Sequence, residues 1–217
     1  MKKMIRVLSA ITAILCAGCT TTGAYQIKDL KGKIEAENSI ALIESSQRTD
    51  QFLKEVFKQT NVMFIVDGRG GELDGMLDTL EYLDSHPEKL VVIDGACYSA
   101  CTLLLSRPRN VVFTENATFL FHSASSSVCR DRKIQTSLSE DGNKKMRKVL
   151  PKPVVRWVEK RKAFSSTKFT RMEAHEAMQM LPNMFVHSED LPMLERTGET
   201  LSTMDTSNLN QMIAACK

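Results

Sequence analysis

The sequence predicts an α/β fold in which helices cover a mainly parallel sheet. Two short apolar runs rich in β-branched residues, at 62–66 and 90–93, each lead into Asp-Gly, which is typical of strands buried on both faces. Between these runs, apolar residues recur at helical spacing over residues 73–83. Strands that alternate with helices favour parallel pairing, because each crossover helix returns the chain to the same end of the sheet.

The individual elements follow from local patterns in chain order. Each predicted helix has apolar residues on one face, and each predicted strand is a short apolar run bounded by turn-forming residues. The elements are a helix at residues 50–59, a strand at 61–71, a helix at 72–86, a strand at 89–95, a helix at 99–106, and two strands at 110–115 and 117–122. Residues 33–43 fit either a strand or the start of a helix.

The second half of the chain is more polar. We expect a loop at 123–133, a basic helical region at 141–162 that Pro151 and Pro153 interrupt, and a further helix at 172–181. The 217 residues are 42% apolar and 25% charged, which is typical of a globular protein. No internal repeat or Gly/Ser-rich linker divides the chain, so residues 32–217 are predicted to form a single domain.

The first 31 residues are expected to lie outside that domain. A basic start, an apolar stretch at 7–17 and small residues before Cys19 predict a secretory signal peptide over 1–18. The ending CAGC resembles a bacterial lipoprotein cleavage box, which implies lipid on Cys19 and a tether over 19–31. The expected location is therefore the periplasmic side of the bacterial cell envelope, with the protein held on the membrane through this lipid. Simple secretion is the alternative if Cys19 is not acylated.

Charge and ligand-type residues exclude several classes of function. The basic residues Lys2, Lys3 and Arg6 of the signal account for the formal net charge of +3, so the remainder of the chain is formally neutral. A neutral chain gives no reason to expect a nucleic-acid partner. No grouping of His, Cys and Asp has the spacing of a metal site, and we expect neither a metal nor a cofactor.

Chemistry-bearing residues follow three of the predicted strands. Gly70 and Gly71 end the first strand, Ser99 stands at the turn after the second, and His122 ends the last. Ligands meet the carboxyl ends of strands in open α/β sheets, so these residues are expected to converge. A serine at a strand-to-helix turn can act as nucleophile with His122 as base, and the amides of Ala100 and the glycine pair can face an oxyanion.

Each of these residues also has an ordinary structural explanation. Ser99 could be a helix N-cap, His122 a strand-end residue bonded to a carbonyl, and the glycine pair a bare turn. Four cysteines remain after the signal peptide and Cys19, and they allow three pairings. Cys97 and Cys101 could bridge across the serine turn or be two small buried apolar residues. Pairing of the other two, Cys129 and Cys216, would tie the loop after His122 to the C-terminal region.

Three segments together resemble the ClpP-like serine peptidases of the ClpP/crotonase fold. They are FIVDGRGGELDGMLDTLEYL at 64–83, VVIDGACYSACTLLL at 91–105 and NVVFTENATFLFH at 110–122. Secreted bacterial ClpP-like proteins with a CxSAC turn and a segment like VRWV at 155–158 are similar as well. The resemblance implies a ClpP/crotonase-like fold, self-association into a homo-oligomer, Ser99 as nucleophile, His122 as base, and oxyanion donors at Gly71 and Ala100.

One position departs from the family pattern. The resemblance implies an aspartate about fifty residues after the histidine, but Phe169 falls nearest that place. Glu173 is the nearby candidate for a third carboxylate, and Asp131 and Asp190 are more distant candidates. The family's SPGG is also GRGG here.

Two functions from different classes follow from these residues. The first is a membrane-tethered serine hydrolase, most simply a peptidase acting on a peptide or protein substrate. The second is a catalytically inactive ClpP-like lipoprotein that serves binding or assembly in the envelope. A crotonase-like acyl-CoA enzyme would share the glycine-amide oxyanion hole, but CoA substrates are not expected outside the cytoplasm.

Overall fold

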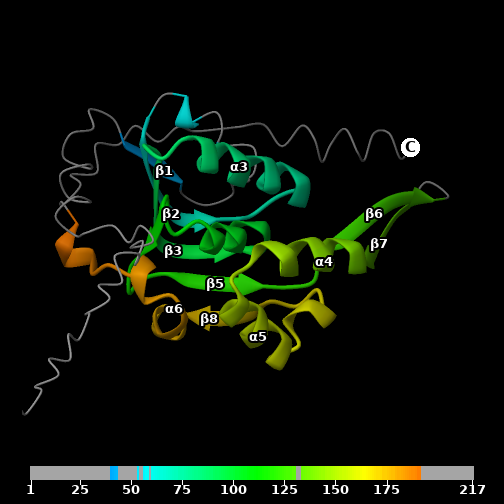
Figure 1. The fold of residues 1–217 in the computed structure, drawn as a ribbon. Coiled ribbons are helices and arrows are strands. Elements are labelled where there is room, and N and C mark those ends of the chain that lie inside the picture. Colours follow the sequence, from blue (N-terminus) through cyan, green and yellow to red (C-terminus); the bar gives the residue numbers. More distant parts are fainter. Residues whose placement is uncertain (1–39, 44–52, 54–55, 59, 131–132, 192–217) are drawn as a thin grey trace, which may run out of the picture.

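The computed structural model describes residues 40–43, 53, 56–58, 60–130 and 133–191, and shows one α/β domain (Figure 1). The main sheet of the described chain has six strands in the order β1-β2-β3-β5-β8, with β4 also paired to β3. All pairs are parallel except β5 with β8. The predicted α/β class and mainly parallel sheet are confirmed.

The long central strand β3 organises the sheet. β1 (Ile40–Ile43) and β2 (Val62–Gly68) lie on one side of β3 (Leu90–Tyr98). On its other side, β4 (Val111–Phe113) pairs with the first half of β3, and β5 (Thr118–Phe121) pairs with the second half. The break between the strands predicted at 110–115 and 117–122 falls between β4 and β5, and the strand alternative for residues 33–43 is the correct one at β1.

Both faces of the sheet are covered, as the unbroken apolar runs require. On β2, Met63 and Ile65 belong to the larger core cluster, which also contains residues of α3 (Leu73–Ser85) and η1 (Ser99–Ser106). Val62 and Phe64 point into a smaller cluster on the opposite face, together with Val186 and Leu191. Burial on alternate faces explains why the strand is apolar at every position rather than at every second one.

The remaining helices lie beyond β5 in the chain. They are α4 (Glu140–Val149), α5 (Lys152–Lys160), η2 (Ala163–Ser165), α6 (Ala174–Met180), η3 (Pro182–Met184) and η4 (Ser188–Asp190). The break between α4 and α5 falls at Pro151, as predicted, but Pro153 does not interrupt the helix, since it lies in the first turn of α5, where proline is tolerated. Of the predicted helix at 50–59, the described residues Leu53, Val56 and Phe57 are helical and buried. No helix in the described ranges has the length and apolar character to cross a bilayer.

Two expectations for the second half are wrong. The polar loop predicted at 123–133 instead contains β6 (Ser125–Arg130), which pairs with β7 (Lys133–Leu138) in an antiparallel hairpin that projects from the body in Figure 1. The hairpin strands SSSVCR and KIQTSL are mostly polar and show no regular alternation of apolar residues, so no pattern marked them. The helix predicted at 172–181 instead begins as β8 (Thr170–Glu173), because residues 170–173 pair with β5 before α6 starts.

Candidate active site

Ser99 occupies a sharp turn between β3 and η1. Its φ is 54°, a left-handed conformation that only Ser99 and Lys162 adopt among the non-glycine residues that the structure describes. Such a conformation is uncommon for a residue with a side chain and requires support from its surroundings. The N-cap position of η1 is Tyr98 rather than Ser99, and the Ser99 hydroxyl is hydrogen-bonded to His122, so the N-cap explanation does not account for Ser99.

His122 meets the hydroxyl of Ser99. The distance from His122 Nε2 to Ser99 Oγ is 2.6 Å, which is a hydrogen bond. The parallel pairing of Tyr98 with Leu120 brings the carboxyl ends of β3 and β5 together. Ser99 directly follows β3, and His122 directly follows β5. Two residues 23 positions apart are thus placed in the geometry of a nucleophile and its base.

The other ring nitrogen of His122 is buried and has no hydrogen-bond partner in the described structure. Burial lowers the pKa of His122 below its ordinary value, and the backbone of Ser123 opposes this shift only in part. The imidazole is therefore neutral at neutral pH, and in the tautomer with its proton on Nδ1 it can accept a proton at Nε2. This state is the one that a general base requires.

The glycine pair packs directly against the serine turn. Gly70 has φ 80°, and a Cβ at this position would lie 2.5 Å from the carbonyl oxygen of Tyr98 and 3.0 Å from the amide nitrogen of Ala100. Gly71, with φ 147°, also has a conformation that favours glycine. The close approach places the Gly71 segment beside the first amides of η1, where an oxyanion hole would be built.

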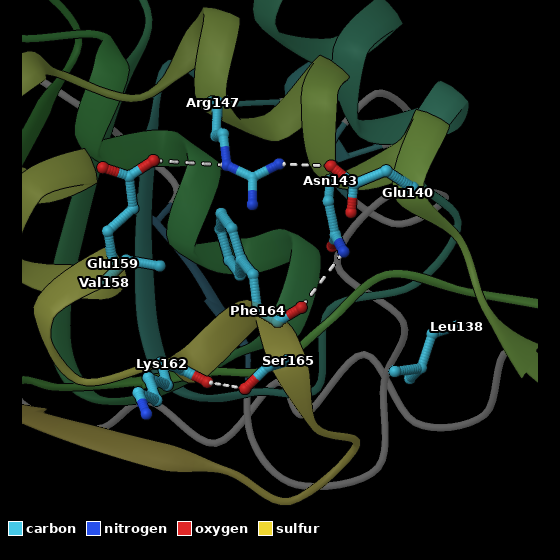
Figure 2. A pocket seen from close by; sticks show the side chains of 9 residues that line it. All are labelled: Leu138, Glu140, Asn143, Arg147, Val158, Glu159, Lys162, Phe164 and Ser165. Atoms are coloured by element: carbon cyan, nitrogen blue, oxygen red, sulfur yellow. Dashed lines mark hydrogen bonds and ion pairs between the residues drawn. The ribbon is translucent and has the colours of Figure 1, made fainter.

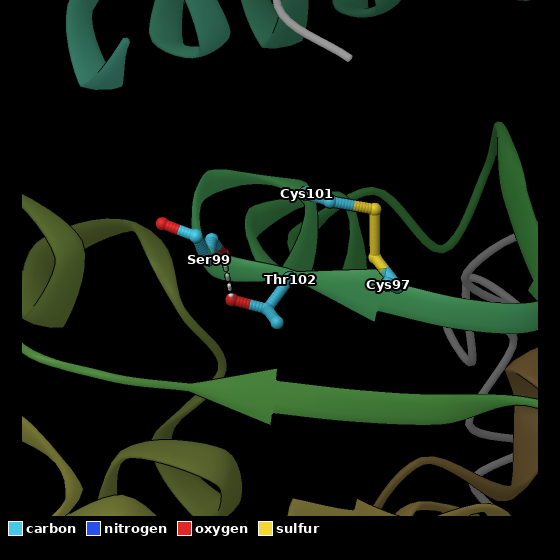
Figure 3. The surroundings of a disulfide bond; sticks show 4 residues. All are labelled: Cys97, Ser99, Cys101 and Thr102. Atoms are coloured by element: carbon cyan, nitrogen blue, oxygen red, sulfur yellow. Dashed lines mark hydrogen bonds between the residues drawn. A yellow bond between two sulfur atoms is a disulfide. The ribbon is translucent and has the colours of Figure 1, made fainter. Parts of the chain in front are cut away.

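A disulfide between Cys97 and Cys101 spans the turn (Figure 3). Their Cα atoms are 5.4 Å apart, both residues are fully buried, and the Ser99 side chain points away from the bridge. Thr102 Oγ1 also donates a 2.7 Å hydrogen bond to the carbonyl oxygen of Ser99. The proposed pairing of Cys129 with Cys216 lies partly outside the described residues, since Cys216 is not among them.

None of the described candidates for a third carboxylate bonds to His122. Glu173 forms an ion pair with Arg171 at 2.7 Å and takes part in the capping box of α6. Asp190 lies in η4, and Asp131 is outside the described residues. Since Nδ1 of His122 has no partner, the structure contains a serine–histidine pair without an orienting acceptor in its described part.

Phe169 lies beside the histidine where the resemblance implies an aspartate. Its ring centroid is 4.9 Å from that of His122 at an interplanar angle of 81°, and 5.5 Å from that of Tyr98 at 74°. Arg69 in turn lies over the Tyr98 ring at 5.6 Å. The sequence placed Phe169 at the position where the resemblance implies an aspartate. Its contact with the ring of His122 could not be predicted from the sequence.

Asn143 is a second residue near the base that sequence reasoning missed. Its side chain is buried, accepts a 2.8 Å hydrogen bond from the Ala124 amide, and donates to Ser123 Oγ and to the carbonyl oxygen of Phe164. These bonds tie the segment after His122 to α4 and η2. A lone asparagine in a polar, basic stretch of sequence carries no signal for such a role.

A cavity of about 440 Å³ lies between α4, α5 and η2 (Figure 2). Arg147 projects into it and pairs with Glu140 at 2.9 Å and Glu159 at 3.5 Å, so its charge is already balanced. Neither Ser99 nor His122 lines this cavity. Within the described ranges, no group of three or more His, Cys, Asp or Glu residues could hold a metal ion.

Comparisons with known proteins add little to this geometry. No family model and no curated protein matches the chain. A solved structure described as a peptidase from Plasmodium falciparum is 14% identical, with a TM-score of 0.40, and covers 68% of this chain and 94% of its own. A likeness of this degree carries no argument about activity, so the function must be argued from the site.

Proposed function

We propose that this chain is a serine hydrolase that works through an acyl-enzyme on Ser99. The observation that carries the proposal is the 2.6 Å hydrogen bond from Ser99 Oγ to His122 Nε2 at a strand-to-helix turn. A serine hydroxyl is a weak nucleophile until an adjacent base takes its proton. The neutral, half-buried imidazole is suited to that step.

Each group then has one task in the reaction. Ser99 Oγ attacks the carbonyl carbon of the substrate while its proton passes to His122 Nε2. The amides of Gly71 and Ala100 face the oxyanion, and His122 returns the proton to the leaving group as the bond to carbon breaks. A water molecule repeats the same two proton transfers and releases the acid, which restores the free hydroxyl of Ser99.

The ClpP-like resemblance extends the proposal to substrate and location. A peptide or protein substrate fits a site with one nucleophile, one base and backbone oxyanion donors, and needs no cofactor. Lipid on Cys19 would place the enzyme on the periplasmic side of the envelope membrane, with the domain held through residues 19–31. A homo-oligomer of ClpP/crotonase-like domains is the assembly that the resemblance implies.

A second function is favoured by one specific observation. His122 Nδ1 is buried without a partner, whereas serine–histidine sites generally fix that nitrogen through a carboxylate. An inactive ClpP-like lipoprotein with a binding or assembly role would tolerate this defect.

Labelling with a fluorophosphonate probe tests the two functions. The processed chain, purified in detergent, is compared with Ser99→Ala and with the matched control Ser106→Ala. Ser106 lies at the other end of η1, and its hydroxyl bonds only to the Leu103 carbonyl oxygen and the Arg107 side chain. We expect the wild type and Ser106→Ala to be labelled and Ser99→Ala to be unlabelled. Equal labelling of all three contradicts the hydrolase, and no labelling of the wild type favours the binding protein.

A further inference from the structure

We propose that Phe169 is a positioning residue for His122: its ring holds the imidazole in the orientation that places Nε2 on Ser99. In this respect the aromatic ring replaces the hydrogen-bonded carboxylate that orients the histidine of many serine hydrolases. The inference rests on the proposed function, which makes His122 the base.

The first argument is that something other than a hydrogen bond must orient the imidazole. Nε2 is bonded to Ser99 Oγ at 2.6 Å, but Nδ1 is buried and makes no hydrogen bond of normal geometry in the described structure; the backbone of Ser123 is the polar group that acts on this ring. A ring held by a single hydrogen bond at one edge can swing about its own side-chain torsions. Contact with neighbouring groups has to limit this swing if the 2.6 Å geometry is to persist.

The register of β5 and β8 supplies the contact. Residues 118 to 121 of β5 pair with residues 173 to 170 of β8 in antiparallel order. Continuing this register by one pair sets Phe169 opposite His122, and directly opposed residues on antiparallel strands interact through their side chains. The observed ring contact, 4.9 Å between centroids at 81°, is the edge-to-face arrangement that aromatic pairs prefer.

The same ring also contacts the strand that carries the nucleophile. Phe169 lies edge-on to Tyr98, the residue before Ser99, with centroids 5.5 Å apart. The Phe169 ring therefore contacts two residues of the site. One is Tyr98, which precedes the nucleophile in the chain, and the other is His122, the base. A wedge between these two residues would keep the spacing of hydroxyl and imidazole constant.

Burial in the core does not explain the position of Phe169. Its side chain is 51% exposed, and the only other exposed large apolar side chains in the described structure are Val128 and Leu138 of the projecting hairpin. A phenylalanine kept at the surface forgoes much of the free energy that its burial would contribute. The contacts of Phe169 with Tyr98 and His122, rather than burial in the core, account for the position of its ring.

The test compares Phe169→Leu, which keeps apolar bulk without a ring, with Phe169→Tyr, which keeps the ring. Val128→Ala is the matched control for truncating an exposed apolar side chain elsewhere. For the fluorophosphonate, we expect Phe169→Leu to lower the maximal inactivation rate by roughly tenfold, less than the 10²-fold that a 1 Å misplacement can cost. The probe concentration for half-maximal rate should stay unchanged, and Phe169→Tyr and Val128→Ala should behave as the wild type. An unchanged rate in Phe169→Leu, or a change only in that probe concentration, overturns the proposal.

A second measurement does not depend on turnover. Nitrogen-15 NMR of the His122 ring reports its tautomer and its titration, in the wild type and in Phe169→Leu. Because burial lowers the pKa of His122, removing part of the ring cover should raise this pKa toward its ordinary value and broaden the tautomer distribution. Identical ring signals and titration in both proteins overturn the positioning role. If the wild type is never labelled, the hydrolase proposal fails, and this measurement still decides the role of Phe169.

Discussion

The nucleophile and the base of the candidate site are held in different ways. The turn at Ser99 is fixed by a covalent bridge, by the Thr102 hydrogen bond and by the close approach of Gly70. These constraints act on the backbone, so the left-handed conformation of Ser99 is over-determined. The imidazole of His122 has one hydrogen bond and one aromatic contact, both made by its side chain.

This contrast predicts which substitutions the site should tolerate better, those around the Ser99 turn or those around the His122 side chain. Constraints on a backbone fail together, since moving the turn displaces the hydroxyl and the amide of Ala100 at once. Constraints on a side chain fail by degrees, because an imidazole that samples several orientations still spends part of its time on the hydroxyl. Substitutions on the nucleophile side should therefore have larger effects than those on the base side.

The largest effect is expected from Gly70→Ala. The added methyl group would lie 2.5 Å from the carbonyl oxygen of Tyr98, and φ of 80° strains any residue with a side chain. The turn must move, and with it the amides proposed for the oxyanion hole. Loss of one oxyanion donor costs about 10²–10³ in rate, so the labelling rate should fall by that order.

The measurement is the fluorophosphonate labelling rate together with the urea-unfolding midpoint. Arg69→Ala, which removes an exposed side chain from the same loop, is the control and should keep the wild-type midpoint. Gly70→Ala should unfold at lower urea concentration as well. A labelling rate close to that of the wild type would contradict the over-determined turn.

The sequence predicts the nucleophile side better than the base side for a related reason. Apolar runs that end in glycine mark β2 and β3 in the sequence. Once these two strands are paired in parallel, the Gly70 segment and Ser99 lie together, so no other element has to be predicted. The environment of His122 depends on β8, whose four residues bury only Met172 and therefore show no strand pattern. Without β8, no register sets Phe169 opposite His122. The hydrogen bonds of Asn143 across α4 and η2 are equally invisible to local patterns.

A smaller effect is expected when the disulfide is removed by the double substitution Cys97→Ala and Cys101→Ala. The bridge closes a loop of only a few residues, so its loss should lower the free energy of unfolding by about 2 kcal/mol. Gly70 and Thr102 still support the turn, and we expect the labelling rate to fall by roughly tenfold at most, less than for Gly70→Ala.

Urea unfolding and labelling kinetics under non-reducing conditions check this expectation. Treating the wild type with a reductant under denaturing conditions, followed by refolding with the thiols alkylated, gives an independent comparison. A double variant that loses all labelling while remaining as stable as the wild type would show that the bridge, rather than the glycine packing, fixes Ser99.

The smallest effect is expected in the comparison of Phe169→Asp with Phe169→Asn: both substitutions remove the ring and should lower the rate as Phe169→Leu does, and the difference between them concerns pH dependence. Burial lowers the pKa of His122, so the acidic limb of the labelling rate should lie below the ordinary histidine pKa of about 6.5. The base acts only when unprotonated, and activity is therefore lost as the pH falls through this lowered pKa. A carboxylate about 5 Å from the imidazole stabilises its charged form and raises its pKa, so the acidic limb should move to higher pH.

Phe169→Asn is the matched control, because it removes the same ring and adds a polar group of nearly the same size without charge. The pH profile of the second-order labelling rate constant is recorded for both variants and for the wild type. A limb that shifts upward in the Asp variant relative to the Asn variant places residue 169 within electrostatic reach of the base. If the acidic limbs of the two variants coincide, the carboxylate points away from His122. The difference between the serine turn and the imidazole would then rest only on how rigidly each is held.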